Sequence, residues 1–588
     1  MFGFGNDPRM AADLMKGQMA VSQMIKSLEV AEEATPCDDV VNQSRIRLNT
    51  EILHHLHLCL DKCRVFCGRQ KEVSLVEQFV KHSHHRQPLV VYGSSGSGKT
   101  AFCAVVTKKI RMWLGDHSVV VARFLGTSAR SSTLAPLLSS ICQQICIAYK
   151  IIPDKRKLAN RRKLAKYLQE LLLHVSLMFG SSLPLVVILD SLDQLSPVDS
   201  SHELSWLPVD VPSGVHIILS VKEEADHLMN KLRAVFPDKK SCFIELAQLS
   251  ENVILEYIGA YSSAQSRNFT DSQYEYLVEH LSKYPQPLLM KISMDEACCW
   301  NSYTELDHLK LPSCVREAVV ALFERYEKRF GKIFIEAALG YITASKGGIG
   351  YIELEDALSC SDHVLSDVYE YHNPPLDGVI RIPPLLWARA KFGLQDYIVE
   401  RLAQGKTTLS WYHWQFFDVA MKRYVSGDVR TRLHSVLAEV YDALQPVRRT
   451  IRLEKRKLTI LDADRQIALQ QLTSENVRKL IALPYHLLCA GDTARLRALC
   501  WCNLKFITCY IKAFSFSDLL AAMSEMLTDR SDVDIEIIYY TLRFSSIAFD
   551  NDSEMLPVQL LGSLLKFAST HQSIQTLCQQ CSDVIVSR

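Results

Sequence analysis

The chain has 588 residues, of which 48% are hydrophobic and 22% are charged, close to the average for soluble globular proteins. At about 100–200 residues per domain this length predicts three to five domains, and the composition excludes a mostly disordered or collagen-like chain. The 66 lysines and arginines balance 65 acidic residues, so nucleic-acid binding would need a local patch rather than a global positive charge.

Eighteen cysteines are scattered along the chain without the paired spacing of a zinc site. The first residues lack the apolar segment of a signal peptide, and the apolar runs fall far below the ~18 residues that a membrane span needs. Free thiols without an export signal predict a reducing compartment. We therefore expect a cytoplasmic protein with no membrane-spanning segment.

The first part of the chain predicts helices followed by an α/β domain. Residues 1–65 are expected to form a helical segment. After a further helical pattern, short and continuously apolar runs alternate with helical stretches; these runs are Leu89–Tyr92, Val119–Phe124, Leu185–Leu189 and Val215–Leu219, with Cys242–Leu246 as a fifth candidate. Unbroken hydrophobicity is typical of strands that are buried on both faces of a parallel sheet. The alternation therefore predicts a doubly wound parallel sheet over residues 66–248.

Strand signals fade after residue 250. Residues 249–310 predict short helices, residues 311–425 mix helices with turn-rich segments, and residues 426–588 are expected to be nearly all helical. Two basic stretches, Asp154–Lys166 and Arg448–Lys457, are interpreted first as solvated helix faces or loops. Binding of nucleic acid or an acidic partner is the alternative, but no aromatic residues interleave with these charges to stack on bases.

One segment carries the clearest chemistry. Gly93–Thr100, GSSGSGKT, matches the phosphate-loop pattern G-x-x-x-x-G-K-[ST] between an apolar strand and a helix. Its glycines let the backbone wrap so that N–H groups face phosphate oxygens, and the helix that follows adds its positive end. Lys99 can reach the β- and γ-phosphates, and the Thr100 hydroxyl can bind Mg²⁺. The nucleotide-binding candidates in this segment are Gly93, Ser94, Ser95, Gly96, Ser97, Gly98, Lys99, Thr100 and Ala101.

A second signature follows the third apolar run. Asp190 ends this run, where a carboxylate beside the phosphate loop can hold Mg²⁺, so Thr100 and Asp190 are the metal candidates. Asp193 can polarise an attacking water, and we assign catalytic roles to it and to Lys99. Ser220 and Lys222 end the next strand, where they can sense the γ-phosphate. The alternatives are a surface or capping role for Asp193 and ordinary strand-end positions for the other two.

These motifs resemble a known family. The segment Phe66–Arg69, the two phosphate-site motifs and Arg123–Leu138 resemble the NACHT-type ATPases. Further segments resemble the NACHT domain- and WD repeat-containing proteins, which are STAND-class signal-transduction ATPases; these segments are Leu311–Gly331, Gly347–Ser359, Trp411–Tyr424 and Leu483–Asp492. The resemblance implies an NTPase domain over 66–248, a small helical domain over 249–310, a winged helix over 311–425 and a C-terminal all-α region over 426–588.

The family's WD repeats would follow about where this chain ends, and no spaced GH…WD blocks occur in it. An isoform, a fragment and an incomplete gene model would look alike in this respect.

The resemblance also implies three further nucleotide contacts. They come from Cys67 in the FxGR-type motif, from Pro287, which would pack near adenine, and from His413, which would contact a phosphate from the winged helix. A helix-start proline and a packed core histidine are the alternatives for the last two. Gln194 stands where many relatives have a second acid, and Lys222 replaces a common arginine. Both departures argue for slow hydrolysis.

The sequence therefore predicts a regulatory ATPase switch with ATP or ADP and Mg²⁺ as cofactors. ADP would hold the winged helix on the NTPase domain, and exchange for ATP would release it and permit self-association as a signalling scaffold. The alternatives are a DNA-binding AAA-like ATPase that uses its winged helix, and a nucleotide-binding scaffold without hydrolysis. We expect protein partners and no nucleic acid, because residues 311–425 contain no basic stripe.

Overall fold

The structure of the chain is a computed structural model that separates residues 1–53 from residues 54–588. It describes residues 39–63, 66–81, 86–128, 130–159, 161–195, 201–236, 242–304, 309–375, 378–403, 406–514, 516–549 and 555–587. The helices predicted before residue 39 therefore lie outside the described residues. Helix α2 (Asp39–Lys62) begins in the first unit and ends in the second.

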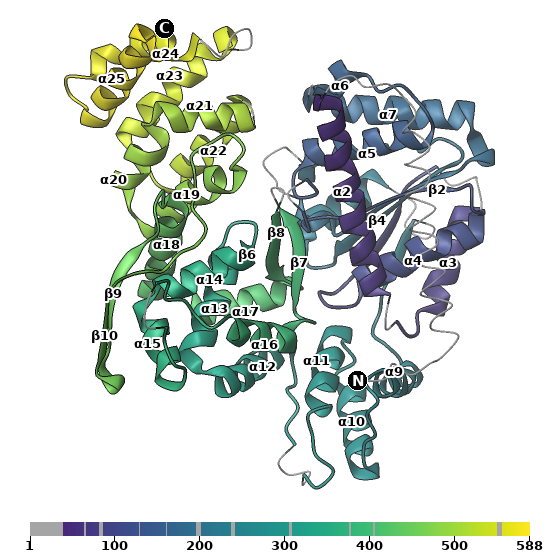
Figure 1. Cartoon of the computed structure of the whole chain (residues 1–588). Helices are drawn as coiled ribbons and strands as arrows, with labels where there is room; N and C mark the ends of the chain where they lie inside the picture. The colour runs from purple at the N-terminus through teal and green to yellow at the C-terminus, as the bar shows by residue number, and fades with distance from the viewer. Residues whose placement is uncertain are drawn as a thin grey trace. The chain divides into compact units, whose positions relative to one another are not determined.

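A five-stranded parallel sheet forms the centre of the N-terminal half (Figure 1). Its strands are β1 (Leu89–Gly93), β2 (Val119–Phe124), β3 (Leu185–Asp190), β4 (Val215–Lys222) and β5 (Phe243–Glu245), in the order β2-β3-β4-β1-β5. The register places Gly93 beside Lys222 and Phe124 beside Asp190. The carboxyl ends of these strands therefore meet at one edge, where the predicted site residues lie.

Helices cover both faces of this sheet (Figure 1). Val186 and Ile188 belong to the core under α3 (Gln70–Lys81) and α4 (Lys99–Leu114), while Val187 and Leu189 belong to the core on the other face. Helices α5 (Leu134–Ala148), α7 (Arg161–Met178) and α8 (Asp226–Val235) cover that other face. Alternate side chains of β3 thus enter opposite cores, which explains its unbroken apolar run. The predicted doubly wound sheet is confirmed.

Three helices with their own small core follow the sheet: α9 (Glu251–Ala264), α10 (Asp271–Lys283) and α11 (Pro287–Ala297). Thr270 caps α10 through a capping box with Gln273. Pro287 is the first residue of α11, a position at which the missing N–H of proline costs no hydrogen bond.

The winged-helix region combines helices with a three-stranded antiparallel sheet in the order β6-β8-β7. Its elements are α12 (Val315–Phe330), α13 (Lys332–Ala344), β6 (Ile349–Gly350), α14 (Tyr351–Cys360), α15 (Asp362–Tyr371), α16 (Pro384–Leu394), β7 (Ile398–Ala403), β8 (Lys406–Trp411) and α17 (Trp414–Tyr424). Buried residues from this region and from the C-terminal helices form one continuous core. The five-part division of the chain remains a prediction.

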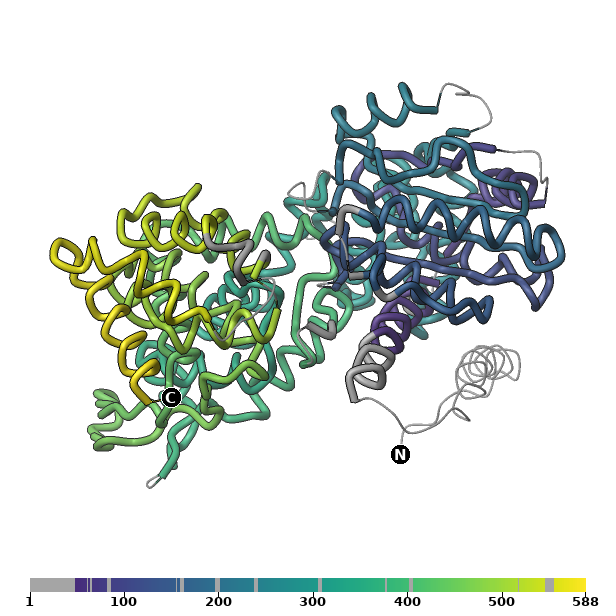
Figure 2. Tube along the Cα trace, turned by 90° about the horizontal axis from the view of Figure 1, so that it is seen from above, coloured from purple at the N-terminus to yellow at the C-terminus, as the bar shows by residue number. Residues whose placement is uncertain are grey.

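The C-terminal region is mainly helical, and α24 and α25 pack side by side at its end (Figures 1 and 2). Its helices are α18 (Gly427–Asp442), α19 (Val477–Ala490), α20 (Thr493–Leu496), α21 (Leu504–Ala513), α22 (Phe516–Asp529), α23 (Val533–Phe549), α24 (Leu556–Leu564) and α25 (Gln572–Val586). No single helix in the described ranges is long and apolar enough to cross a membrane, although one bent pair, α21 with residues 518–529, could by length and composition.

One hairpin departs from the nearly all-helical pattern expected after residue 430. Strands β9 (Arg448–Leu453) and β10 (Leu458–Asp464) pair antiparallel. Ile451 and Leu453 are buried, whereas Arg452 between them is exposed. This alternation has the two-residue period of a half-buried strand, which the charges of the basic stretch obscured. The other basic stretch forms α6 (Lys155–Ala159) and the start of α7, as a helix-face interpretation predicts.

Candidate functional site

The phosphate loop joins β1 to α4. Gly96 and Gly98 have φ of 81° and 91°, a region in which a residue with a Cβ is strained. The loop therefore needs glycine at these two positions to wrap tightly before α4 begins at Lys99. The Lys99 ammonium is buried and donates hydrogen bonds to the carbonyl oxygens of Gly93 and Ser94, each at 2.8 Å. Burial lowers the pKa of Lys99, while the nearby Asp190 opposes this shift.

Asp190 is buried and is bound by three hydroxyl groups. It accepts hydrogen bonds from Thr100 Oγ1 at 2.8 Å, Ser220 Oγ at 2.6 Å and Ser191 Oγ at 3.2 Å. Burial raises the pKa of this carboxyl group, and the three hydroxyls oppose the shift. Ser220 also accepts a hydrogen bond from the backbone N–H of Ser191 at 2.8 Å. The Ser220 side chain thus orients Asp190. Its contact with the γ-phosphate remains a prediction.

The oxygens of Thr100 and Asp190 form a donor set that suits magnesium. Mg²⁺ prefers hard oxygen ligands and is usually held by one or two protein groups together with phosphate oxygens and water. No cluster of three or more His, Cys, Asp or Glu side chains able to hold a metal occurs in the described part of the chain. A magnesium ion would therefore be held by Thr100 and Asp190 together with its nucleotide.

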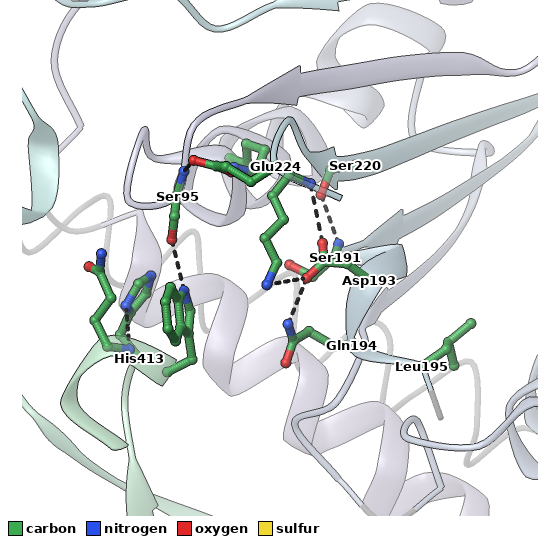
Figure 3. A network of polar contacts seen from close by, with 12 residues as sticks. Ser95, Ser191, Asp193, Gln194, Leu195, Ser220, Glu224 and His413 are labelled. Atoms are coloured by element: carbon green, nitrogen blue, oxygen red, sulfur yellow. Dashed lines mark hydrogen bonds and ion pairs between the residues drawn. The ribbon is translucent and has the colours of Figure 1, made fainter. Parts of the chain in front are cut away.

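Asp193 lies one turn beyond Asp190, in the short 3₁₀ helix Leu192–Gln194. Its carboxylate forms an ion pair with Lys222 Nζ at 3.2 Å and accepts hydrogen bonds from the Lys222 backbone N–H and from Gln194 Nε2 (Figure 3). These donors occupy the oxygens that would accept a hydrogen bond from an attacking water. For Asp193 to act as a catalytic base, its ion pair with Lys222 would first have to break.

The FxGR-type segment contacts the loop through its arginine. Gly68 has φ of 72°, and a Cβ there would lie 2.6 Å from a methyl carbon of Val253. The Arg69 guanidinium donates to the Ser97 carbonyl oxygen at 3.4 Å and pairs with Glu72. Burial raises the pKa of the Cys67 thiol, and its predicted contact with a nucleotide remains a prediction.

Beside the loop lies a cavity of about 260 Å³. Its walls include Ser94, Ser97, Tyr284, Gln286 and Pro287. Within the described part of the chain the Ser97 hydroxyl is buried without a hydrogen-bond partner. An unpaired buried hydroxyl in a cavity wall is costly unless a ligand or water satisfies it. Pro287 begins α11, as the helix-start alternative predicts, and it also lines the cavity next to the phosphate loop. Its packing near adenine remains a prediction.

His413 lies near the phosphate loop (Figure 3). Its Nδ1 accepts a hydrogen bond from the Gln415 backbone N–H at 3.3 Å and so caps α17. Because Nδ1 is the acceptor in the neutral ring, the proton lies on Nε2. Burial and the charges of Lys62, Lys99 and Lys222 lower the pKa of His413 to about 4. The neighbouring Trp414 donates from its indole Nε1 to Ser95 Oγ at 2.8 Å.

Four residues at this site were not among the predicted ones. Arg69, Gln286 and Trp414 contact the loop, and the Glu224 carboxylate accepts a hydrogen bond from the Ser95 backbone N–H. Arg69 belongs to the quoted FxGR-type segment and Gln286 precedes the predicted Pro287, so the sequence carried a signal for both. Trp414 directly follows the predicted His413 in the quoted segment Trp411–Tyr424, whereas Glu224 belongs to no pattern that indicates a phosphate site.

A parallel sheet with a phosphate loop after β1 and a buried acidic residue at the end of β3 defines a P-loop ATPase fold with a winged helix. Family models agree: an AAA ATPase domain matches residues 65–220, and an NWD1-like, winged helix-turn-helix domain matches residues 309–432. Fold and loop together support nucleotide binding.

Similarity to curated proteins extends over most of the chain. NACHT domain- and WD repeat-containing protein 1 of Homo sapiens is 32% identical to this chain over 555 residues. The match covers 92% of this chain and 35% of the relative. The Mus musculus protein is 32% identical over 91% of this chain and 34% of the relative. NACHT and WD repeat domain-containing protein 2 of Homo sapiens is 32% identical over 67% of this chain and 23% of the relative. The chain is thus a homologue of these proteins, as its motifs predict, and spans about a third of the length of the member 1 relatives.

Solved structures match more distantly. The Orc1 protein of Aeropyrum pernix, solved in complex with DNA, is 11% identical to this chain, with a TM-score of 0.30. The match covers 61% of this chain and 94% of the Orc1 chain. The Orc2 protein of the same organism is 15% identical, covers 62% and 96%, and has the same TM-score of 0.30. Similarity at this level carries no functional conclusion.

Substituting Asp190 by Asn should weaken Mg²⁺-dependent ATP binding by about tenfold or more, because it removes the charge beside the Thr100 hydroxyl. Titrating ATP with Mg²⁺ and again with a chelator measures the effect. Asp193→Asn is the matched control, since Asp193 lies next to the site but pairs with Lys222. The same magnesium dependence in Asp190→Asn as in the unsubstituted chain would contradict the metal assignment.

Proposed function

We propose that the chain is a nucleotide-dependent regulatory switch. ADP bound at the phosphate loop holds the winged-helix region against the NTPase domain, and exchange for ATP releases it for self-association and binding of protein partners. Slow hydrolysis returns the closed state. The observation that carries the proposal is the position of His413, a winged-helix residue that lies near Ser95 of the phosphate loop (Figure 3) and close enough to Lys99 and Lys222 for their charges to lower its pKa.

The electrostatics around His413 favour an anion between the two regions. Lys62, Lys99 and Lys222 come from three different elements and all lower the pKa of His413. Among the described groups near them, Asp193 pairs with Lys222 and Asp190 interacts with Lys99. A nucleotide phosphate would add negative charge among these cations and accept a hydrogen bond from Nε2 of His413. Such a phosphate would contact both regions at once.

The remaining nucleotide groups have defined places in this proposal. The adenine would lie in the cavity beside Pro287, where the Ser97 hydroxyl offers a hydrogen bond. The loop N–H groups and Lys99 would bind the phosphates. Mg²⁺, when bound by Thr100 and Asp190, would neutralise phosphate charge. We retain the proposed boundaries 66–248, 249–310, 311–425 and 426–588 for the parts that the switch moves.

The test of the switch uses two substitutions of His413. His413→Ala removes both the proposed phosphate donor and the cap of α17. His413→Asn keeps an acceptor that can cap α17, but its shorter side chain should not reach the phosphate. Losing a charged hydrogen bond costs the closed state about 1.5–3 kcal/mol. If the closed state is favoured 99:1 over the open state, destabilising it by about 2.7 kcal/mol makes the two equally populated. The loss of this hydrogen bond is therefore sufficient to populate the open state.

Both variants should therefore release ADP faster and expose the segment after residue 310 to protease. Only His413→Ala should also melt at a lower temperature without nucleotide, because only it loses the cap. An unchanged ADP off-rate in His413→Asn would remove the switch proposal.

ADP affinity should rise as pH falls toward the pKa of about 4 of the free imidazole, and His413→Asn should lose most of that slope. The nucleotide-free imidazole has a pKa of about 4, set by burial and by Lys62, Lys99 and Lys222. A bound phosphate raises this pKa, so the complex holds more protons than the free protein, and acid favours it. The difference between the two slopes cancels the titration of ADP itself. Parallel slopes would show that His413 does not face the phosphate.

A nucleotide-binding scaffold without hydrolysis is the second candidate. It is favoured by the ion pair between Asp193 and Lys222, which occupies the carboxylate that would polarise water. Single-turnover hydrolysis at saturating nucleotide separates the two candidates. If Asp193 positions water, Asp193→Asn should spare binding and slow hydrolysis. If this substitution leaves the rate unchanged, Asp193 is not the catalytic base.

A further inference from the structure

Three separate segments of the chain bind one residue of the phosphate loop. The Ser95 backbone N–H donates to Glu224 Oε1 at 3.0 Å, its Oγ accepts from Trp414 Nε1 at 2.8 Å, and its carbonyl oxygen accepts from Gln286 Nε2 at 2.6 Å (Figure 3 shows the first two). Glu224 follows β4, Gln286 precedes α11, and Trp414 begins α17. The N–H, the side chain and the carbonyl of Ser95 are therefore each engaged by a different element.

Trp414 makes two contacts with the phosphate site. Besides the bond to Ser95, its ring faces Lys222 Nζ at 5.2 Å from the ring centre, within the range of a cation–π interaction. The side chain is 44% exposed, so packing in a core does not fix its position. Neither contact involves a nucleotide. The hydrogen bond to Ser95 can therefore hold the start of α17 on the loop when the site is empty.

Glu224 connects this bond to the nucleotide. In a phosphate loop the backbone N–H groups are the donors that bind phosphate oxygens. The exposed Glu224 carboxylate takes the N–H of Ser95 as a phosphate would. A phosphate that binds this N–H must displace Glu224 and also repels its negative charge. Because hydrogen bonds weaken steeply away from linearity, a reorientation of Ser95 would also break the bond from Trp414.

We propose that the hydrogen bond from Trp414 to Ser95 is a latch that holds the winged-helix region on the empty phosphate loop and opens when phosphate displaces Glu224 from Ser95. The latch acts without nucleotide, whereas the His413 contact of the proposed switch needs one. Its opening by phosphate rests on the proposed function, because it assumes that nucleotide binds this loop. Its closed form can be tested without nucleotide.

The first experiment uses the full chain stripped of nucleotide. Trp414→Phe keeps an aromatic ring and removes the indole donor, and Ser95→Ala removes the acceptor. Hydrogen exchange over residues 93–98 and proteolysis after residue 310 report opening. Losing a neutral hydrogen bond changes an equilibrium constant by a factor of about 2–10. Each substitution should therefore increase the equilibrium constant for opening by that factor. The double variant should open no more than either single one, because both remove the same bond.

Phe417→Leu is the matched control, since Phe417 is an exposed aromatic residue one turn further along α17. It should leave opening unchanged. The proposal is overturned if Trp414→Phe exchanges like the unsubstituted chain, or if the effects of Trp414→Phe and Ser95→Ala multiply in the double variant.

The second experiment tests the link to phosphate. Glu224→Gln removes the competing charge, so affinity for ADP and ATP should rise by about 2–10-fold, with a larger change for ATP because its phosphates carry more charge. Unchanged affinities would overturn the phosphate-controlled opening. His413→Asn separates this proposal from the switch: it should not alter the nucleotide-free opening that Trp414→Phe increases. An unchanged ADP off-rate in His413→Asn alone would remove the switch and leave the nucleotide-free latch standing.

Discussion

Replacing Lys99 by alanine is expected to lower the affinity for both ATP and ADP by about 10- to 150-fold. Lys99 is buried, and its ammonium donates to the loop carbonyls of Gly93 and Ser94. A bound phosphate would take these donors in a site with little competing water. Hydrogen bonds to charged groups contribute roughly 1.5–3 kcal/mol, which corresponds to the stated loss in affinity.

Two controls isolate the ammonium from its packing. Lys99→Met keeps most of the buried side-chain volume, and it should lose as much affinity as Lys99→Ala. Lys108→Ala removes an exposed lysine of the same helix and should bind nucleotide normally. Isothermal titration with ADP and ATP measures all three. Identical titration curves for Lys99→Ala and the unsubstituted chain would remove nucleotide binding at this loop.

The sequence was sufficient to predict the sheet and its loop because their signals are local. Each strand is a short apolar run, and Gly93–Thr100 contains the glycines and the lysine that its geometry needs. The apolar runs also predict that the strands are parallel, so that their carboxyl ends and the motifs that follow them lie at one edge. The strand order β2-β3-β4-β1-β5 comes from the structure and was not part of that prediction. The hydrogen bond from Thr100 to Asp190 at 2.8 Å shows that the two predicted metal ligands lie side by side, and their metal role remains a prediction.

The contacts of Ser95 could not be predicted, because they join residues far apart in the chain. Glu224, Gln286 and Trp414 lie 129, 191 and 319 positions away from Ser95. No pattern within a short window of sequence indicates which exposed tryptophan will meet a loop serine. The ion pair that engages Asp193 is of the same kind, since its partner Lys222 comes from the next strand. Local motifs thus locate the site, and tertiary contacts decide how its residues are paired.

A buried ion pair joins the winged-helix region to the C-terminal helices. Arg478 of α19 donates to both carboxylate oxygens of Glu353 in α14, and the Tyr441 hydroxyl of α18 donates to the same carboxylate at 2.9 Å. The two charged side chains are only 2% and 5% exposed. Burial alone would raise the pKa of Glu353, but the charge of Arg478 and the hydrogen bonds lower it overall.

Arg478→Met should lower the free energy of unfolding by about 3–5 kcal/mol, because it leaves a buried carboxylate without its cation. Urea denaturation, monitored through hydrogen exchange of the backbone amides of α18 and α19, measures the loss. Lys422→Met is the control: Lys422 is 56% exposed and pairs with Asp418 on the surface, where a pair contributes at most about 1 kcal/mol. Equal losses in the two variants would contradict the role assigned to the buried pair.

The same pair predicts how this region responds to acid. Because the folded pKa of Glu353 lies below its unfolded value, the carboxylate stabilises the fold at pH above the unfolded value of about 4.3. That contribution is lost as pH falls through the folded pKa, where the carboxylate takes up a proton and the pair breaks. Glu353→Gln should therefore be less stable than the unsubstituted chain at pH 7 and should lose less stability between pH 5 and pH 3. If both proteins lose stability equally over this range, Glu353 is not the group that acid titrates.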